Sequence, residues 1–174
     1  MSKTYKFVIT GAFNAGKTTF VNTLSDISAI NTDKAISNPI EKAVKASTTT
    51  ALDYGQVNLG QDLTVHLFGT PGQPRFDFMR HILSKGMDGF IFLVDSSNQA
   101  QLDRAGELLS KFSQLGDTPL VVAANKADLP GLSVDELRTQ LRLPAKQLIV
   151  SCVAMDREAA EHVIEVLVAL VEQG

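Results

Sequence analysis

Short, continuous apolar runs alternate with longer amphipathic segments along the whole of this 174-residue chain. The apolar runs have the length of strands and the amphipathic segments that of helices, which is the pattern of β–α–β units. Because the crossovers of such units are right-handed, they bring the strands into a mostly parallel sheet with helices on both faces. We therefore expect one α/β domain over residues 1–174, with three layers and a six-stranded sheet.

The pattern places each element along the chain. Strands are expected at 5–10, 51–59, 63–68, 89–95, 120–124 and 147–152, the second and third forming a hairpin around 60–62. Helices are expected at 17–24, 76–83, 100–115, 134–141 and 157–171. A long polar stretch covers 27–50, and a loop of this length in a compact domain is usually functional. Ligands bind such sheets at the carboxyl ends of the strands, where the motifs below lie.

A phosphate-binding pattern directly follows the first strand. Residues 11–18 (GAFNAGKT) match G-x-x-x-x-G-K-[ST] at every position. Backbone N–H groups of such a loop and the N-terminus of the next helix hold nucleotide phosphates. The lysine reaches the terminal phosphates and the final hydroxyl ligates Mg²⁺, while asparagine tolerates a left-handed backbone. The phosphate-site candidates are Phe13, Asn14, Ala15, Gly16, Lys17, Thr18 (also a metal ligand) and Thr19.

A second motif, at 125–128 (NKAD), follows the fifth expected strand and bears on which base is bound. The Asp128 carboxylate can accept two N–H bonds from the edge of guanine, whereas adenine offers a different pattern. Asn125 is expected to tie this loop to the phosphate loop, and the stem of Lys126 to cover the base. The two motifs together predict a site for GTP and GDP rather than for ATP.

These motifs resemble those of the Ras-like small GTPases, and the likeness covers nearly the whole chain. It implies a P-loop domain that binds GTP or GDP with Mg²⁺. The family's last base loop, usually Ser-Ala-Lys, is Ser151-Cys152-Val153 here, so the N–H of Cys152 or Val153 is implied to hold the guanine oxygen. Segments 70–73, 83–89 and 94–96 also resemble a narrower group, the bacterial MglA-like GTPases and the predicted GTPases found with roadblock-domain proteins.

The second switch of the family is implied to lie at residues 69–73, where Asp-x-x-Gly-Gln is usual. Gly72 matches the glycine that meets the γ-phosphate, and Gln73 the catalytic residue that orients the attacking water. Gly69 replaces the aspartate that supports Mg²⁺ through water, so we expect weaker coupling between Mg²⁺ and GDP. Asp53 is a possible substitute for that aspartate, but a role on the strand surface is favoured for it.

The first switch is implied to lie near residues 47–50. Alignment of Asp53-Tyr54 with the family's Asp-Phe pair selects Thr49 as the residue that meets Mg²⁺ and the γ-phosphate, with Thr48 and Thr50 left open. Phosphoryl transfer also needs a cation near the developing charge. Arg75 is the candidate in the same chain, ahead of Lys42 and Lys45, although solvent exposure is favoured for all three of these side chains.

Composition and short targeting signals narrow the binding partners and the cellular location that are expected. A net charge of −3 gives no support for binding to nucleic acid or to an anionic membrane. The lone cysteine, Cys152, suits a reducing compartment and is expected to be a buried, inert thiol rather than a redox sensor. No bilayer-spanning run, N-terminal myristoylation signal or C-terminal prenylation cysteine is recognised. A cytoplasmic protein without a lipid anchor is expected.

Three functions remain in order of preference. The first is a molecular switch that hydrolyses GTP slowly and is regulated by a partner. The resemblance to MglA-like proteins suggests a roadblock-domain regulator and leaves the effector unknown. The second is a guanine-nucleotide-binding module with little or no hydrolysis. The third, a P-loop kinase or ATPase, is disfavoured by the guanine motif and by the lack of an acceptor-binding lid.

Overall fold

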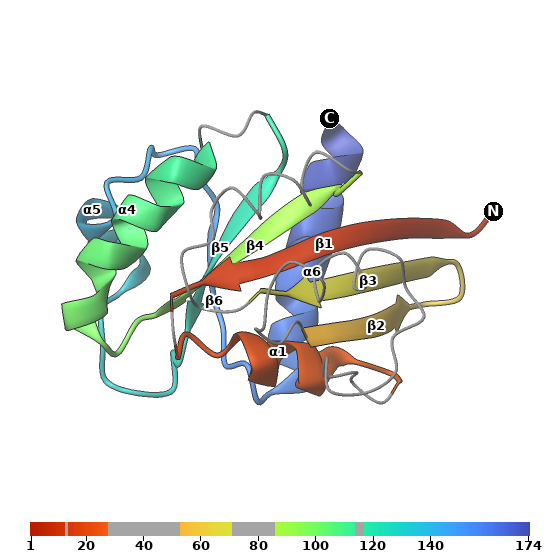
Figure 1. The fold of residues 1–174 in the computed structure, drawn as a ribbon, viewed down its shortest axis with the longest axis horizontal. Coiled ribbons are helices and arrows are strands. Elements are labelled where there is room, and N and C mark those ends of the chain that lie inside the picture. The colour runs from red at the N-terminus through yellow and green to blue at the C-terminus, as the bar shows by residue number, and fades with distance from the viewer. Residues whose placement is uncertain (13, 28–52, 71–85, 114–116) are drawn as a thin grey trace, which may run out of the picture.

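A six-stranded sheet forms the centre of the protein, with strand order β2-β3-β1-β4-β5-β6 (Figure 1). The structure, a computed structural model, describes residues 1–12, 14–27, 53–70, 86–113 and 117–174. Its strands are β1 (Lys3–Gly11), β2 (Asp53–Leu59), β3 (Leu63–Gly69), β4 (Gly89–Asp95), β5 (Leu120–Asn125) and β6 (Ile149–Ser151). Among the strands of the described residues, five run parallel and only the β2–β3 pair is antiparallel, so the predicted, mostly parallel sheet is confirmed.

Helices cover both faces of this sheet. The helices of the described ranges are α1 (Lys17–Leu24), α4 (Leu102–Ser113), α5 (Val134–Gln140) and α6 (Arg157–Gln173), with a short 3₁₀ turn, η1 (Gln99–Gln101), before α4. Contacts place α1 and α6 together on one face and α4 and α5 on the other (Figure 1). The expected helix at 76–83 and most of the loop at 27–50 lie outside the described residues.

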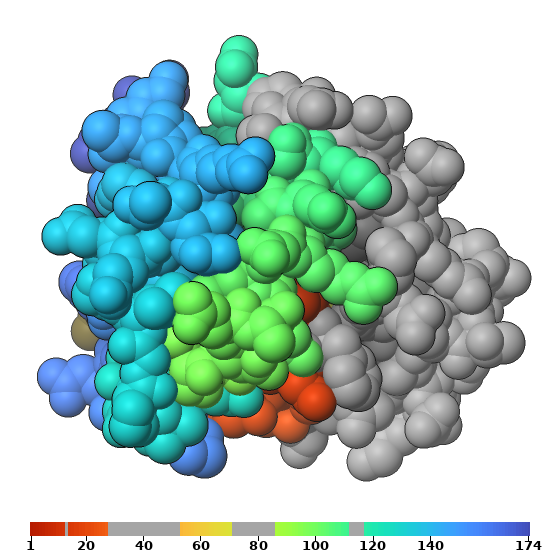
Figure 2. All heavy atoms as spheres, turned by 90° about the vertical axis from the view of Figure 1, so that its left-hand side faces the viewer, coloured from red at the N-terminus to blue at the C-terminus, as the bar shows by residue number. Residues whose placement is uncertain are grey.

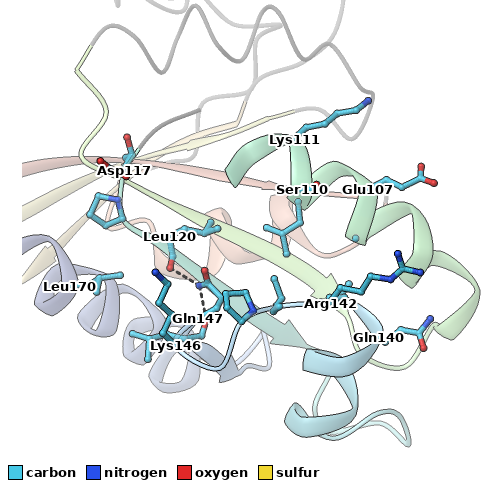
Figure 3. Close-up of a pocket in the computed structure, with 18 of the residues that line it drawn as sticks. Glu107, Ser110, Lys111, Asp117, Leu120, Gln140, Arg142, Lys146, Gln147 and Leu170 are labelled. Carbon is cyan, nitrogen blue, oxygen red and sulfur yellow. Dashed lines mark hydrogen bonds between the residues drawn. The ribbon is translucent and has the colours of Figure 1, made fainter. Parts of the chain in front are cut away.

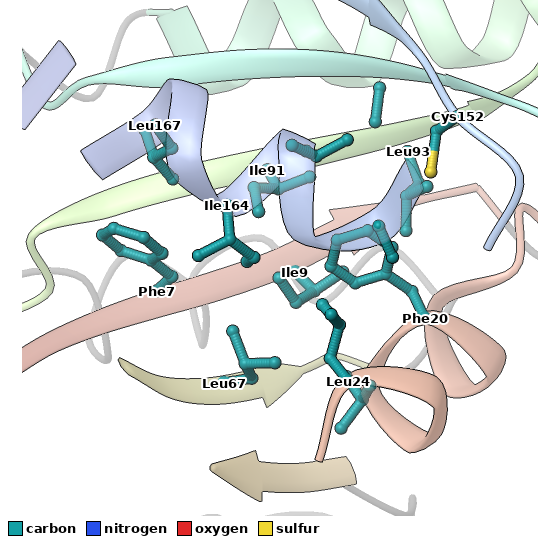
Figure 4. Packing of buried hydrophobic residues seen from close by; sticks show 14 of the residues in the cluster. Phe7, Ile9, Phe20, Leu24, Leu67, Ile91, Leu93, Cys152, Ile164 and Leu167 are labelled. Atoms are coloured by element: carbon teal, nitrogen blue, oxygen red, sulfur yellow. The ribbon is translucent and has the colours of Figure 1, made fainter. Parts of the chain in front are cut away.

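Alternation along the central strands builds a core on each face. In β1, Phe7 and Ile9 pack beneath α1 and α6 while Val8 packs on the α4 side, and all three side chains are fully buried. β4 repeats the pattern, with Ile91 on the first face and Phe92 on the second. Figure 4 shows the core on the α1 and α6 side. Burial on both faces explains why these strands are continuous apolar runs in the sequence.

The order of the strands decides where the loops go. Because β1, β3, β4, β5 and β6 are parallel, their carboxyl ends meet along the same end of the sheet. The phosphate motif follows β1, residue 69 ends β3, and the guanine motif follows β5. None of the described helices is both long and apolar enough to cross a membrane.

Candidate functional site: a phosphate loop joined to a base loop

The loop after β1 has the backbone that its sequence predicts. Asn14 has a φ of 63° and Gly16 a φ of 103°, both in the left-handed region. A Cβ atom on Gly16 would collide with the amide nitrogen of Asn125, so glycine is required here for space as well as for φ. The loop therefore turns sharply into α1, whose first residue is Lys17, and aims the helix N-terminus at the space beyond the strand.

Lys17 holds its positive charge inside this loop. Its side chain is buried, and its Nζ donates hydrogen bonds to the carbonyl oxygens of Gly11 at 2.6 Å and Ala12 at 2.9 Å. Burial lowers the pKa of Lys17 to about 8, although the Asp53 carboxylate acts in the opposite direction. A buried ammonium held mainly by neutral carbonyls favours an incoming anion, because an anion offsets the cost of burying the charge.

Thr18 makes a contact that links two distant elements. Its Oγ1 donates a 2.6 Å hydrogen bond to Oδ2 of Asp53, the first residue of β2. The expectation that Asp53 has a strand-surface role is therefore wrong, because the carboxylate faces the phosphate loop. The predicted Mg²⁺ ligand Thr18 thus lies beside a carboxylate, and both are oxygen donors of the kind that Mg²⁺ prefers.

Asn125 joins three loops from a buried position at the end of β5. Its Nδ2 donates to the carbonyl oxygen of Ala15 in the phosphate loop at 2.8 Å. Its Oδ1 accepts from the backbone N–H of Ala154, also at 2.8 Å. The predicted tie between the base motif and the phosphate loop is confirmed, and the same side chain also holds the loop that follows β6.

Lys126 makes a second tie. The residue has a φ of 60°, which turns the chain out of β5, and its Nζ contacts the Asn14 carbonyl oxygen at 3.3 Å. The same Nζ pairs with Oδ2 of Asp95 at 2.7 Å. Burial acts to raise the pKa of Asp95, but the hydrogen bonds from Lys126 and Ser97 outweigh it and keep that pKa below its ordinary value. The stem of Lys126 is thereby fixed at both loops.

The loop after β6 corrects one detail of the prediction. The Cys152 N–H donates to the Ala124 carbonyl oxygen at 2.8 Å, and the Cys152 carbonyl accepts from Ala127 N–H at 3.1 Å. Because its N–H is engaged with β5, Cys152 cannot also hold a guanine oxygen with that group. Of the two residues proposed for this contact, Val153 remains the candidate. Ser151 ends β6 and is exposed.

Other expected site residues fall in two groups. Asp128, the last residue of the guanine motif, and Thr19, which follows the phosphate motif, are among the residues that the structure describes, and both are exposed. Outside the described residues lie Phe13, Lys42, Lys45, Thr48, Thr49, Thr50, Gly72, Gln73 and Arg75.

Two contacts of the site were not predicted from the sequence. Asp95 belongs to the segment 94–96 of the resemblance, and it lies directly opposite Asn125 in the β4–β5 register. An aspartate that ends a strand beside the guanine motif was the available signal. The backbone N–H of Ala154 left no signal, because any residue supplies that donor.

A groove elsewhere on the molecule is separate from this site. It lies between α4 and the segment 141–148 and reaches the end of α6, and none of the described residues of the predicted nucleotide site lines it (Figure 3). Gln147 crosses its floor and donates to the carbonyl oxygens of Leu120 and Leu148. Leu120 begins β5, so the groove lies at the opposite end of that strand from Asn125. Figure 2 views the molecule from the side on which α4 and α5 lie, with α4 in green and the α5 segment in cyan beside it.

The sheet order and the geometry of the phosphate loop define a P-loop domain of the small GTPase type, and the comparisons agree. The solved structure of the small GTPase Arl6 from Trypanosoma brucei, with a bound nucleotide analogue, matches with a TM-score of 0.69 over 98% of this chain and 99% of that chain. At 19% sequence identity this match supports the fold alone. The family model of the ADP-ribosylation factor (Arf) family matches residues 1–171. The chain belongs to the ADP-ribosylation factor family.

Curated relatives agree with this assignment. Human ADP-ribosylation factor-like protein 4C is 34% identical over 78% of this chain and 68% of its own length. The mutual gliding-motility protein MglA of Myxococcus xanthus is 29% identical over 78% of this chain and 74% of its own length. An uncharacterized protein of Methanocaldococcus jannaschii is 31% identical over 76% of both chains. The predicted resemblance to Ras-like GTPases, MglA among them, is confirmed.

Proposed function

We propose that this protein is a molecular switch that binds GTP and GDP with Mg²⁺ and hydrolyses GTP slowly to GDP and phosphate. The observation that carries the proposal is the joining of the base loop to the phosphate loop by Asn125 and Lys126. The phosphate loop accounts for binding of a nucleoside triphosphate. The base loop is tied to the phosphate loop, which accounts for recognition of a base in the same site. Membership of the Arf family supports the guanine assignment in general terms.

Each half of the site has its proposed contacts. The backbone of 14–19 and the Lys17 ammonium hold the phosphates, and the Thr18 hydroxyl holds Mg²⁺ together with Thr49. When bound, the metal neutralises charge between the outer phosphates. On the base side, Asp128 accepts the guanine N–H groups, Lys126 covers the ring and Val153 donates to the guanine oxygen.

Base selectivity is tested with Asp128→Asn. Loss of the carboxylate removes the acceptor for two guanine N–H groups, so GDP affinity is expected to fall by roughly 10⁴-fold, while affinity for xanthosine diphosphate rises. Competition of GDP, ADP and xanthosine diphosphate against a fluorescent GDP measures both changes. Asp117→Asn, an exposed carboxylate outside the site, is the matched control and leaves the order of affinities unchanged. Equal binding of GDP and ADP by the unaltered protein would contradict the proposal.

Hydrolysis is proposed to be slow without a partner, since a missing arginine can slow such reactions by about 10³–10⁵-fold. Bulky Phe13 would obstruct an arginine inserted from outside, so the partner, proposed as a roadblock-domain protein, acts by repositioning Gln73 and Arg75. Single-turnover hydrolysis with and without the partner tests this. Gln73→Leu is expected to abolish the stimulated rate, and Arg75→Ala to do so only if that residue supplies the cation. No effect of Gln73→Leu would favour the module without hydrolysis.

The proposed setting of this cycle is the cytoplasm. The cycle ends on an effector that recognises one nucleotide state. The lone cysteine and the low net charge of −3 support this setting.

A further inference from the structure

A carboxylate lies at the phosphate loop beside the position at which Gly69 replaces the aspartate of the Ras-like resemblance. In the register of the hairpin, Asp53 on β2 is directly opposite Gly69, the last residue of β3. Directly opposed residues of an antiparallel pair present their side chains on the same face of the sheet. Position 69 is where the family carries its aspartate, so Asp53 supplies a carboxylate to the same face from the neighbouring strand.

The space around Gly69 is tight on the side of Asp53. A Cβ atom on Gly69 would lie 3.2 Å from the Cβ of Asp53 and 3.2 Å from Cγ2 of Val21. It would also lie 3.6 Å from the Asp53 Oδ2 that accepts the Thr18 hydrogen bond. Gly69 does not have a left-handed φ, so its backbone does not require glycine. The glycine instead leaves room for the Asp53 side chain.

Like charges would act between positions 53 and 69 if both carried a carboxylate. An aspartate at position 69 would put a second carboxylate within a few ångströms of the first, and like charges that close disfavour each other's ionised form. One carboxylate beside Thr18 and Lys17 balances the local charge, since the field of Asp53 already favours the charged form of Lys17. With glycine at position 69, the Asp53 carboxylate faces Thr18 without a second carboxylate from that position.

We propose that Asp53 supports the Mg²⁺ ion through water, in place of the aspartate missing from position 69. This inference rests on the proposed function, because it assumes that a guanine nucleotide and Mg²⁺ occupy the site. Mg²⁺ keeps several of its waters, and a carboxylate that accepts from the Thr18 hydroxyl can accept from such a water. Outer carboxylates of this kind fix the ligands of a metal without touching it. Asp53 also reverses the expectation of weak Mg²⁺ coupling, since the supporting carboxylate is present.

The experiment measures release of fluorescent GDP against Mg²⁺ concentration, with an arm in EDTA that reports nucleotide binding without metal. In the unaltered protein Mg²⁺ is expected to slow release steeply. Asp53→Asn keeps the size of the side chain and removes the charge, so the Mg²⁺ concentration at half effect is expected to rise roughly 10–100-fold. Release in EDTA is expected to change little. Asp62→Asn, an exposed carboxylate in the turn of the same hairpin, is the matched control.

A swap of the two residues makes the test specific to the exchange. Asp53→Gly combined with Gly69→Asp returns the carboxylate to the family position, and the Mg²⁺ dependence is expected to recover to within about threefold of the unaltered protein. Recovery of the Mg²⁺ dependence supports the proposal. If Asp53 had only a structural role on β2, a carboxylate at position 69 on β3 would not restore that dependence. Circular dichroism and thermal unfolding show whether each variant is folded.

The possible failures are distinct. If the unaltered protein binds no GDP in either arm, the proposed function fails and this inference fails with it. If GDP binds but Asp53→Asn leaves the Mg²⁺ dependence unchanged, only the role of Asp53 is overturned. If Asp53→Asn strengthens the Mg²⁺ dependence, the Thr18–Asp53 hydrogen bond competes with the metal. The proposal is then overturned, because Asp53 opposes Mg²⁺ binding instead of supporting it.

Discussion

Burial makes the thiol of Cys152 unreactive. It lies in the core beneath α1 and α6, almost fully shielded from water (Figure 4). Burial, with a smaller effect from Asp156, raises the pKa of its thiol from 9.0 to about 12. Because the thiolate is the reactive form, the expectation of an inert thiol rather than a redox sensor is supported.

Cys152 also gives a pH dependence with a definite sign. Its folded pKa lies above its unfolded pKa, so its contribution to stability is complete below pH 9.0 and is lost as the pH rises toward about 12. Relative to Cys152→Ala, the unaltered protein is expected to lose about 1.4 kcal/mol of unfolding free energy per pH unit in that window. Urea unfolding of both proteins at pH 8 and in the alkaline window measures the difference. A difference that does not vary with pH would contradict the prediction.

Residues at the site differ in how far the sequence could predict them. The left-handed Asn14 and the link made by Asn125 were predictable, because both belong to short motifs in which spacing fixes geometry. The hydrogen bond of Asp53 was not, because the predicted hairpin places Asp53 opposite residue 69 but does not show how α1 packs against β2 and brings Thr18 to the carboxylate.

At the scale of elements, apolar runs and their turns predicted the core strands well. The expected bounds of α1 and β4 are confirmed, since the phosphate loop starts the helix and burial on both faces marks the strand. The differences lie at element ends. β6 covers only Ile149–Ser151, and a 3₁₀ turn takes up the expected start of α4. Such ends depend on local hydrogen bonds, which hydrophobic periodicity does not reveal.

The short helix α5 depends on its N-terminal cap. The Oγ of Ser133 accepts from the Glu136 N–H at 3.2 Å, and the Glu136 carboxylate accepts from the Ser133 N–H at 2.7 Å. Ser133→Ala is expected to lower the unfolding free energy by about 1 kcal/mol, because the Glu136 N–H loses the side-chain oxygen that accepts its hydrogen bond. Urea unfolding measures the loss. Ser133→Asp, which restores a capping oxygen, should recover most of it, and equal losses in both variants would contradict the cap.

At the scale of the whole molecule, sheet order makes one site out of loops that are far apart in the sequence. β1 supplies the phosphate loop, and β5 and β6 on one side of it supply the base loops. β2 and β3 on its other side bring Asp53 and Gly69. Asn125 is where these parts are joined, because its side chain hydrogen-bonds the loop after β1 and the loop after β6 from the end of β5.

Asn125→Ala therefore tests whether the hydrogen bonds of Asn125 stabilise the fold as well as the bound nucleotide. The change leaves the Ala15 carbonyl and the Ala154 N–H, both in buried residues, without this partner. At about 1–3 kcal/mol for each of the two unsatisfied groups, a loss of about 2–6 kcal/mol of unfolding free energy is expected in nucleotide-free protein. Urea unfolding without nucleotide measures this term, and GDP release measures the loosening of the bound state. Asn58→Ala, which removes one exposed hydrogen bond to Thr64 on the hairpin, is the matched control and should stay within about 0.5 kcal/mol. If Asn125→Ala proves as stable as that control but releases GDP faster, Asn125 serves the ligand alone, and other contacts hold the three loops together.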